Sequence, residues 1–133
     1  MTMRDDYVSL YNSYLERCNE HDFAGMTTFY APIIGINGVP TDADAVTAQF
    51  TPIVTAFPDW HWKVRHLIVD GDDLVLHFTV TGTHRGTFRG REATGRQVSV
   101  TEFTLYKVEN GKFAEVWDLL DTDGIMQQIG EVE

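Results

Sequence analysis

The chain has little cysteine, few basic side chains and no long hydrophobic run in its 133 residues. One cysteine, Cys18, excludes an intramolecular disulfide and favours a reducing compartment. No apolar run approaches the ~18 residues of a membrane helix, and no basic segment precedes an apolar one as in a secretory signal. These absences predict a cytoplasmic protein.

Basic residues are half as frequent as acidic ones. Ten Lys and Arg against twenty Asp and Glu give a net charge of −10. Phosphates and anionic lipids would be repelled, so we expect no nucleic acid and no membrane partner. With 43% hydrophobic and 12% aromatic residues, the chain can bury a core and enclose a pocket. Its length predicts a single domain over residues 1–133.

Helical periodicity marks the first part of the chain. A first helix is expected from about Arg4 to Glu20, with Cys18 packed on its apolar face. Asp22 is a candidate N-cap for a short second helix through Tyr30. The apolar face of the first helix carries Tyr7, Tyr11, Tyr14 and Cys18, flanked by Val8 and Leu15.

A third helix is expected after a loop or short strand over residues 31–40. Thr41 and Asp44 resemble a capping box that would open it. Val46, Phe50, Ile53 and Phe57 follow at helical spacing. Pro52 should bend or split this helix, because proline lacks the N–H group and clashes with the preceding turn.

The period changes to two from Trp60 onward, which predicts strands. Residues 70–73 and the Asn110-Gly111 pair are typical of hairpin turns, and residues 86–95, with three glycines, indicate a bend. The last strand would run from Lys112 to about Leu120. One of its faces would carry Ala114, Val116, Asp118 and Leu120, and the other Phe113, Glu115, Trp117 and Leu119.

Both faces of this last strand are largely apolar, which predicts a pocket or helix on one side and a partner on the other. We therefore expect a homodimer. The order of helices, strands and a short final helix is typical of an α+β protein. Three helices on a long, strongly bent, mostly antiparallel sheet would form a cone-shaped barrel with a hollow interior.

Several motifs carry a family resemblance that spans nearly the whole chain. They are Phe57-Pro58-Asp59-Trp60, the turn at 70–73, the run from Gly82 to Gly86 with Phe88 and Gly90, Thr94-Gly95-Arg96, Asn110-Gly111-Lys112 and the stretch 117–130. With them the chain resembles the SnoaL-like polyketide cyclases of the nuclear transport factor 2-like superfamily. The resemblance implies a cone-shaped α+β barrel, and ring closure of a polyketide ester by intramolecular aldol condensation without metal or cofactor.

The resemblance also implies site residues. The family's acid/base aspartate falls on Asp118, and a second acidic position falls on Asp121. Two cavity-lining polar positions of the family fall on Glu102 and Thr104. The resemblance implies a Gln/His pair at these positions, so the chain departs from the family here. An asparagine expected in the loop after the second helix falls one position from Asn37.

Aldol chemistry needs a base for the proton beside a carbonyl, a donor for the enolate oxygen and an acid for the alkoxide. An apolar cavity or a second carboxylate raises a carboxyl pKa toward neutrality. Strand alternation puts Asp118 and Glu102 on one face, with Glu102 opposite about Leu119. Each acid also has a structural interpretation. Asp118 could be solvated or cap the last helix, and Glu102 could point outward in an ion pair. For Asp121 the favoured interpretation is the N-cap of the last helix.

The five histidines lack metal-ligand spacing, so no metal site is expected. His84 would line the mouth of the cone or hydrogen-bond a turn. His61 and His66 fall on opposite faces by parity, and either could face the pocket. Each of the three is a candidate to assist catalysis or to bind substrate.

Aromatic side chains would form an apolar pocket wall suited to a small apolar or aromatic substrate. They are Trp60, Trp62, Phe78, Tyr106 and Tyr11, and tyrosine hydroxyls could serve as oxyanion donors. We expect a cofactor-free acid/base enzyme that uses Asp118, assisted by Glu102 and a histidine, with Thr104 orienting the substrate. Isomerisation, dehydration, epoxide opening and a non-catalytic binding module remain alternatives.

Overall fold

The computed structural model describes residues 2–130. Helices and strands follow one another in the order α1 (Met3–Asn19), α2 (Phe23–Thr27), β1 (Tyr30–Ile36), β2 (Val39–Asp42), α3 (Ala43–Val46), the 3₁₀-helix η1 (Thr47–Phe50), α4 (Thr51–Ala56), β3 (His61–Asp70), β4 (Asp73–Thr83), β5 (Gln97–Glu109), β6 (Lys112–Leu120) and α5 (Thr122–Gly130). The expected α+β class is confirmed.

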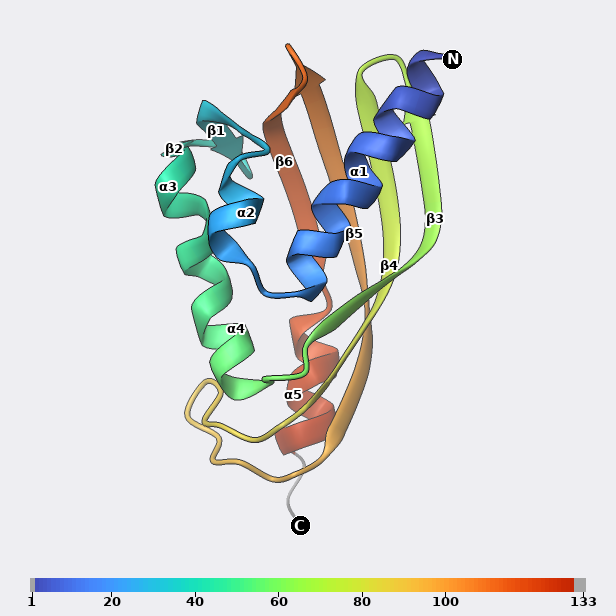
Figure 1. The fold of residues 1–133 in the computed structure, drawn as a ribbon. Coiled ribbons are helices and arrows are strands. Elements are labelled where there is room, and N and C mark those ends of the chain that lie inside the picture. Colours follow the sequence, from blue (N-terminus) through green and yellow to red (C-terminus); the bar gives the residue numbers. More distant parts are fainter. Residues whose placement is uncertain (1, 131–133) are drawn as a thin grey trace.

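A six-stranded sheet with the order β2-β1-β6-β5-β4-β3 forms the body of the molecule. All neighbours are antiparallel except β1 and β6, which are parallel. The long strands curve around α1, which lies across their inner face, and α2 to α4 stand beside it (Figure 1). The result is the cone-shaped α+β barrel that the sequence predicts.

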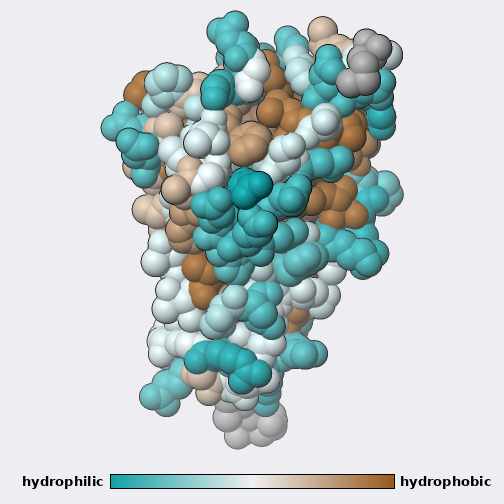
Figure 2. Space-filling view, in the orientation of Figure 1, coloured by the Kyte–Doolittle hydropathy of each residue, from teal (hydrophilic) through white to brown (hydrophobic). Residues whose placement is uncertain are grey.

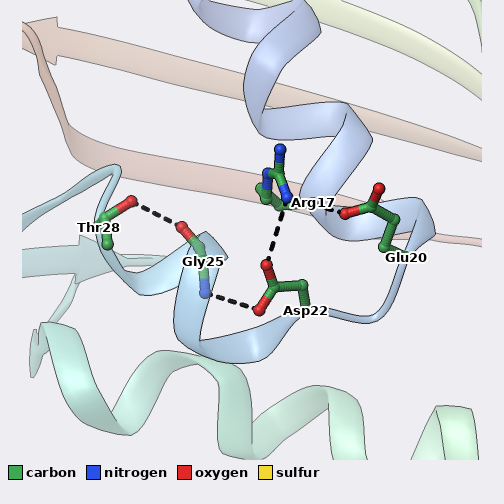
Figure 3. Close-up of polar contacts among 5 residues, drawn as sticks. All are labelled: Arg17, Glu20, Asp22, Gly25 and Thr28. Atoms are coloured by element: carbon green, nitrogen blue, oxygen red, sulfur yellow. Dashed lines mark hydrogen bonds and ion pairs between the residues drawn. The ribbon is translucent and has the colours of Figure 1, made fainter.

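The junction between α1 and α2 is held by polar contacts of Asp22. Asp22 caps α2 by accepting a hydrogen bond from the Gly25 N–H at 3.0 Å, and it lies 3.5 Å from the Arg17 guanidinium (Figure 3). The expected N-cap is therefore confirmed. The helix is shorter than expected, since it ends at Thr27 and Tyr30 already begins β1.

The capping box expected at the third helix is wrong. Thr41 lies in β2 and donates to the carbonyl of Val39, while Asp42 occupies the N-cap position of α3 without a side-chain bond. The expected split is confirmed, because the segment consists of α3, a 3₁₀ turn and α4, with Pro52 in the first turn of α4. Proline is tolerated there because its missing N–H would have no helical partner.

Strand register departs from simple alternation at two places. The pairing shifts between Val64 and His66 in β3, and again opposite Lys107 and Val108 in β6. The second shift turns Phe113 into the core, where it is fully buried, so its expected place on the outer face is wrong. The two predicted hairpin turns are confirmed, with Asn110 and Gly111 both at positive φ.

The core fills the space between α1, the smaller helices and the concave face of the sheet. Hydrophilic residues cover much of the face seen in Figure 2, with larger hydrophobic areas in its upper half. The opposite, convex face of the sheet leaves several large apolar side chains exposed, among them Ile68, Phe103, Trp117 and Leu119. Within residues 2–130 no helix is both long and apolar enough to cross a bilayer.

Candidate functional site

An inner chamber lies between α1, η1 and the concave face of the sheet, with a free volume of about 30 Å³. That is room for one or two water molecules. A second, outer chamber of about 70 Å³ is lined by fewer residues. The two chambers share the side chains of Gln49, Phe50, Trp62, Glu102 and Asp118.

Glu102 is the buried acid of this site. It lies at an inward position of β5 with 8% of its surface exposed, and Trp62 Nε1 donates a hydrogen bond to its Oε1 at 2.9 Å. Burial, with a smaller contribution from the charge of Asp118, raises the pKa of Glu102 from 4.5 to about 7, against the lowering effect of the Trp62 bond. A carboxyl with this pKa can both take and return a proton at neutral pH.

Asp118 lines both chambers from β6 but is only half-buried. Asn37 Nδ2 donates to Asp118 Oδ1 at 2.7 Å, and the Asp118 N–H donates to Asn37 Oδ1 at 2.9 Å. Asn37 reaches it because the Asn37-Gly38 turn, with both residues at positive φ, ends β1 beside β6. This two-residue turn is a favoured hairpin connection for Asn-Gly.

The two carboxylates face the same cavity from neighbouring strands, as the sequence predicts. Their register differs by one residue from the expectation: Glu102 pairs with Leu120, and Asp118 pairs with Thr104. Thr104 is buried and lies between the two acids on β5, where it lines the inner chamber.

Tyrosine hydroxyls line the inner end of the same chamber. Tyr11 and Tyr106 share a hydrogen bond of 3.1 Å, and Tyr14 shares one of 2.6 Å with Tyr30. Cys18 is buried beside them, and burial raises the pKa of its thiol to about 12, which favours the neutral packing role expected for it. The chamber therefore combines aromatic walls with hydroxyl groups.

Aromatic residues expected in the pocket wall are placed there. Trp62, Phe78, Tyr11 and Tyr106 line the inner chamber, and Trp60 lines the outer one. Trp60 is almost fully buried, and its Nε1 has no hydrogen-bond partner in the described structure. Phe50 stands where the chambers meet and packs edge-on against Trp62, with 5.9 Å between the ring centroids.

The other predicted residues lie outside the two chambers. Asp121 caps α5 by accepting from the Gly124 N–H at 2.9 Å, as the favoured interpretation has it. His84 is fully buried against Phe57, with its Nδ1 bonded to Thr94 in the 83–97 connection. That position fits the turn-bonding alternative rather than the cone mouth.

Neither His61 nor His66 lines the cavity, so the expectation that one of them faces the pocket is not met. His61 is exposed. The register shift at Arg65 turns His66 to the convex face, where its Nδ1 shares a 2.9 Å hydrogen bond with His77 Nδ1. Among residues 2–130 no group of three or more His, Cys, Asp or Glu side chains is arranged to hold a metal.

Sequence reasoning missed Gln49 and Phe50 as residues that border both carboxylates. Tyr30 was missed as well, because the expected second helix ran through Tyr30, whereas α2 ends at Thr27. Helical periodicity marks Phe50 only as apolar, so it does not separate a core position from a cavity position. A tyrosine directly after a helix stop, facing other tyrosines, was the available signal for Tyr30.

A strongly curved sheet wrapped around helices, with a buried carboxyl over a small cavity, places the chain in the class of cone-shaped α+β barrels. The SnoaL-like polyketide cyclase family model matches residues 8–129, so the chain belongs to this family. No curated protein matches the chain.

Solved structures share the fold over nearly the whole chain. TsrD from Streptomyces laurentii is 25% identical over 99% of this chain and 100% of its own, with a TM-score of 0.85. A SnoaL-like polyketide cyclase from Agrobacterium tumefaciens is 25% identical over 98% and 99%, with a TM-score of 0.78. AclR from Streptomyces galilaeus, for which hydroxylase activity has been suggested, is 23% identical over 99% and 100%, with a TM-score of 0.85.

Proposed function

We propose that the protein is a cofactor-independent acid/base enzyme that closes a ring in a small, mostly apolar carbonyl compound by intramolecular aldol condensation. The observation that carries the proposal is Glu102. It is a buried carboxyl with a pKa of about 7, set in an aromatic cavity and held by a single N–H donor. Membership of the SnoaL-like cyclase family supports this reaction class.

Glu102 in its ionised form would take the proton from the carbon beside one carbonyl. The enolate carbon would then attack the second carbonyl of the same molecule, which forms the carbon–carbon bond and leaves an alkoxide. Protonated Glu102 would return its proton to that oxygen, so the step consumes no other reactant. Trp62 keeps the carboxyl in one orientation throughout.

Asp118 has a different part in this proposal from the one that the sequence predicts. Its negative charge raises the pKa of Glu102, and its carboxylate accepts a hydrogen bond from Asn37. We therefore assign the proton transfer to Glu102 and the tuning of its basicity to Asp118. The choice of Asp118 as the main proton carrier stays a prediction that the same experiment decides.

Enolisation of 2,6-heptanedione in D₂O tests the proposal. This flexible diketone can close a six-membered ring by aldol condensation, and NMR follows both hydrogen exchange beside the carbonyls and ring closure. We expect Glu102→Gln to lower the exchange rate by about 10²–10⁴-fold. The matched control is Glu109→Gln, at an exposed position of the same strand.

Three outcomes would decide between the alternatives. A loss of exchange in Asp118→Asn but not in Glu102→Gln would restore Asp118 as the proton carrier. Exchange without ring closure would favour an isomerase in the same pocket. Unchanged exchange in both variants would contradict acid/base catalysis and favour a binding module.

A further inference from the structure

Tyr11 and Tyr106 meet at the inner end of the chamber. Tyr11 comes from α1 and Tyr106 from β5, and their hydroxyl oxygens lie 3.1 Å apart. Both side chains are buried, with 1% and 7% of their surface exposed. They line the same chamber as Glu102, and Tyr106 lies four residues further along the same strand face. That spacing corresponds to about 13 Å of strand.

The hydrogen-bond count at this pair leaves one donor unused. Two hydroxyls joined by one hydrogen bond use one of their two hydrogens, and the second needs another acceptor. Within residues 2–130 neither hydroxyl has a partner besides the other. Tyr14 differs, because its hydroxyl interacts with both Tyr30 and the Cys18 thiol. Native proteins rarely leave a buried donor unpaired.

Both hydroxyls stay protonated under ordinary conditions. Burial raises the pKa of Tyr11 and of Tyr106 well above 10. The unused hydrogen is therefore a permanent donor, and the two tyrosines that carry it line a chamber whose walls are otherwise mainly aromatic and aliphatic. A hydroxyl that accepts one bond while it donates another is also a stronger donor.

We propose that the Tyr11–Tyr106 pair binds one carbonyl oxygen of the ligand at the inner end of the chamber. A carbonyl oxygen accepts hydrogen bonds and donates none, which matches the one unused donor. As it stands the chamber holds only one or two water molecules, so a ketone must displace them and widen the chamber to lie between this point and Glu102. This inference rests on the proposed function for its view of the chamber as a substrate site, but its test needs no turnover.

The test compares two probes of nearly equal shape. Acetophenone carries the carbonyl oxygen, and α-methylstyrene carries a CH₂ group in its place. We expect the wild-type protein to bind acetophenone roughly tenfold more tightly than α-methylstyrene. Calorimetric titration or NMR titration measures both affinities.

Three variants and one control give the expected pattern. Tyr11→Phe and Tyr106→Phe should each retain part of the ketone preference, because the remaining hydroxyl still donates. The double variant should lose the preference while its affinity for α-methylstyrene stays within about twofold, which also reports that the chamber is intact. Tyr7→Phe is the control, since its hydroxyl bonds Asp72 and does not line the chamber.

A second measurement keeps the proposal falsifiable if the double variant does not fold. The infrared carbonyl stretch of acetophenone shifts to lower frequency when its oxygen accepts a hydrogen bond. A bound ketone in the wild-type protein with the stretch it shows in hexane would overturn the proposal. An undiminished ketone preference in the double variant, or no ketone preference in the wild type, would overturn it as well.

Failure of the anchor and failure of the proposed function are distinguishable. If Glu102→Gln leaves diketone exchange unchanged while the double tyrosine variant loses its ketone preference, the proposed chemistry fails and the anchor stands. If Glu102→Gln abolishes exchange and the double variant keeps its ketone preference, the anchor fails and the chemistry stands.

Discussion

Trp62 and Glu102 form a donor–acceptor pair across the cavity, with 2.9 Å between Trp62 Nε1 and Glu102 Oε1. The indole N–H stabilises the charged carboxylate and so lowers its pKa, against the larger raising effect of burial. Four influences thus meet on one carboxyl, since the charge of Asp118 also raises its pKa and a hydrogen bond with Thr104 also lowers it. The influences of Trp62 and of Asp118 can each be removed by a single substitution.

Trp62→Phe should raise the pKa of Glu102 above about 7, because it removes the one N–H that favours the ionised form. The pH midpoint of diketone exchange should move to higher pH. ¹³C NMR of the labelled Glu102 carboxyl measures the same shift directly. Trp117→Phe, on the exposed convex face, should leave the midpoint unchanged, and a downward shift in Trp62→Phe would contradict the assignment.

Asp118→Asn should shift the same midpoint in the opposite direction. The substitution removes the negative charge that raises the pKa of Glu102, while the side chain keeps a similar size. The exchange rate should therefore gain at acidic pH and lose its dependence on pH near neutrality. Asp123→Asn, in the first turn of α5, is the charge-matched control. An unmoved midpoint would show that the two acids do not interact.

Glu102→Gln should stabilise the fold at alkaline pH. Folded Glu102 holds its proton up to about pH 7, whereas the unfolded chain releases it near the ordinary value of 4.5. The folded state binds more protons between these values, so its stability falls as pH rises through that window. The Glu102→Gln variant has no proton to release at this position, so its stability does not fall in this way. The difference in the free energy of unfolding between the variant and the wild type should therefore grow in favour of the variant, by about 3 kcal/mol between pH 4 and pH 8.

Urea unfolding at both pH values measures this difference. Glu109→Gln should show no such growth, because Glu109 is exposed. If the advantage of Glu102→Gln were the same at both pH values, Glu102 would not carry a raised pKa in the folded state.

Phe50→Ala should join the two chambers. Phe50 lines both of them and packs on Trp62, so truncation removes the side chain where they meet. We expect a stability loss of about 1–3 kcal/mol for this half-buried ring, together with tighter binding of ketones larger than acetophenone. Unchanged selectivity for ligand size would show that Phe50 does not limit the cavity.

Leu119→Lys should weaken self-association by at least about tenfold. The predicted homodimer needs an apolar face, and two cross-strand rows on the convex side supply one: His66, His77, Phe103 and Leu119, then Ile68, Val75, Leu105 and Trp117. Arg65 lies beyond the first row. Asp73, Lys107 and Glu115 form the row beyond the second, with a net negative charge, so antiparallel packing of two copies would oppose unlike charges. Sedimentation measures the mass, and a monomeric wild type would contradict the dimer.

The sequence predicted most of the fold because its local signals agree. Alternation, turn residues and caps all pointed to the same elements in β3 to β6 and in α1. The errors fell where one inserted residue changes parity, as at Arg65 and opposite Val108, since every side chain beyond a bulge changes face. Phe113 was misplaced for this reason, and the shift at Arg65 invalidates the parity that put His61 and His66 on opposite faces.

The candidate site was predicted in part. The family resemblance and the alternation together brought Glu102, Asp118 and Thr104 to one face, and the structure places all three at the inner chamber. The relative burial of the two acids was out of reach, because it depends on tertiary packing that strand alternation does not encode. The Asn37–Asp118 bonds depend on the parallel pairing of β1 with β6, which no local pattern encodes.

The position of β6 between β1 and β5 has a consequence for the order of folding. The hairpin of β1 and β2 is made early in synthesis, yet its neighbour in the sheet is the last strand of the chain. The side chain of Asn37 can therefore bond its partner, Asp118, only after the chain has been made 81 positions further. Closing so long a loop is slow. We expect the cavity that Glu102 and Asp118 line to close last, and pulse-labelled hydrogen exchange should show β1 gaining protection together with β6 and after the β3–β4–β5 meander.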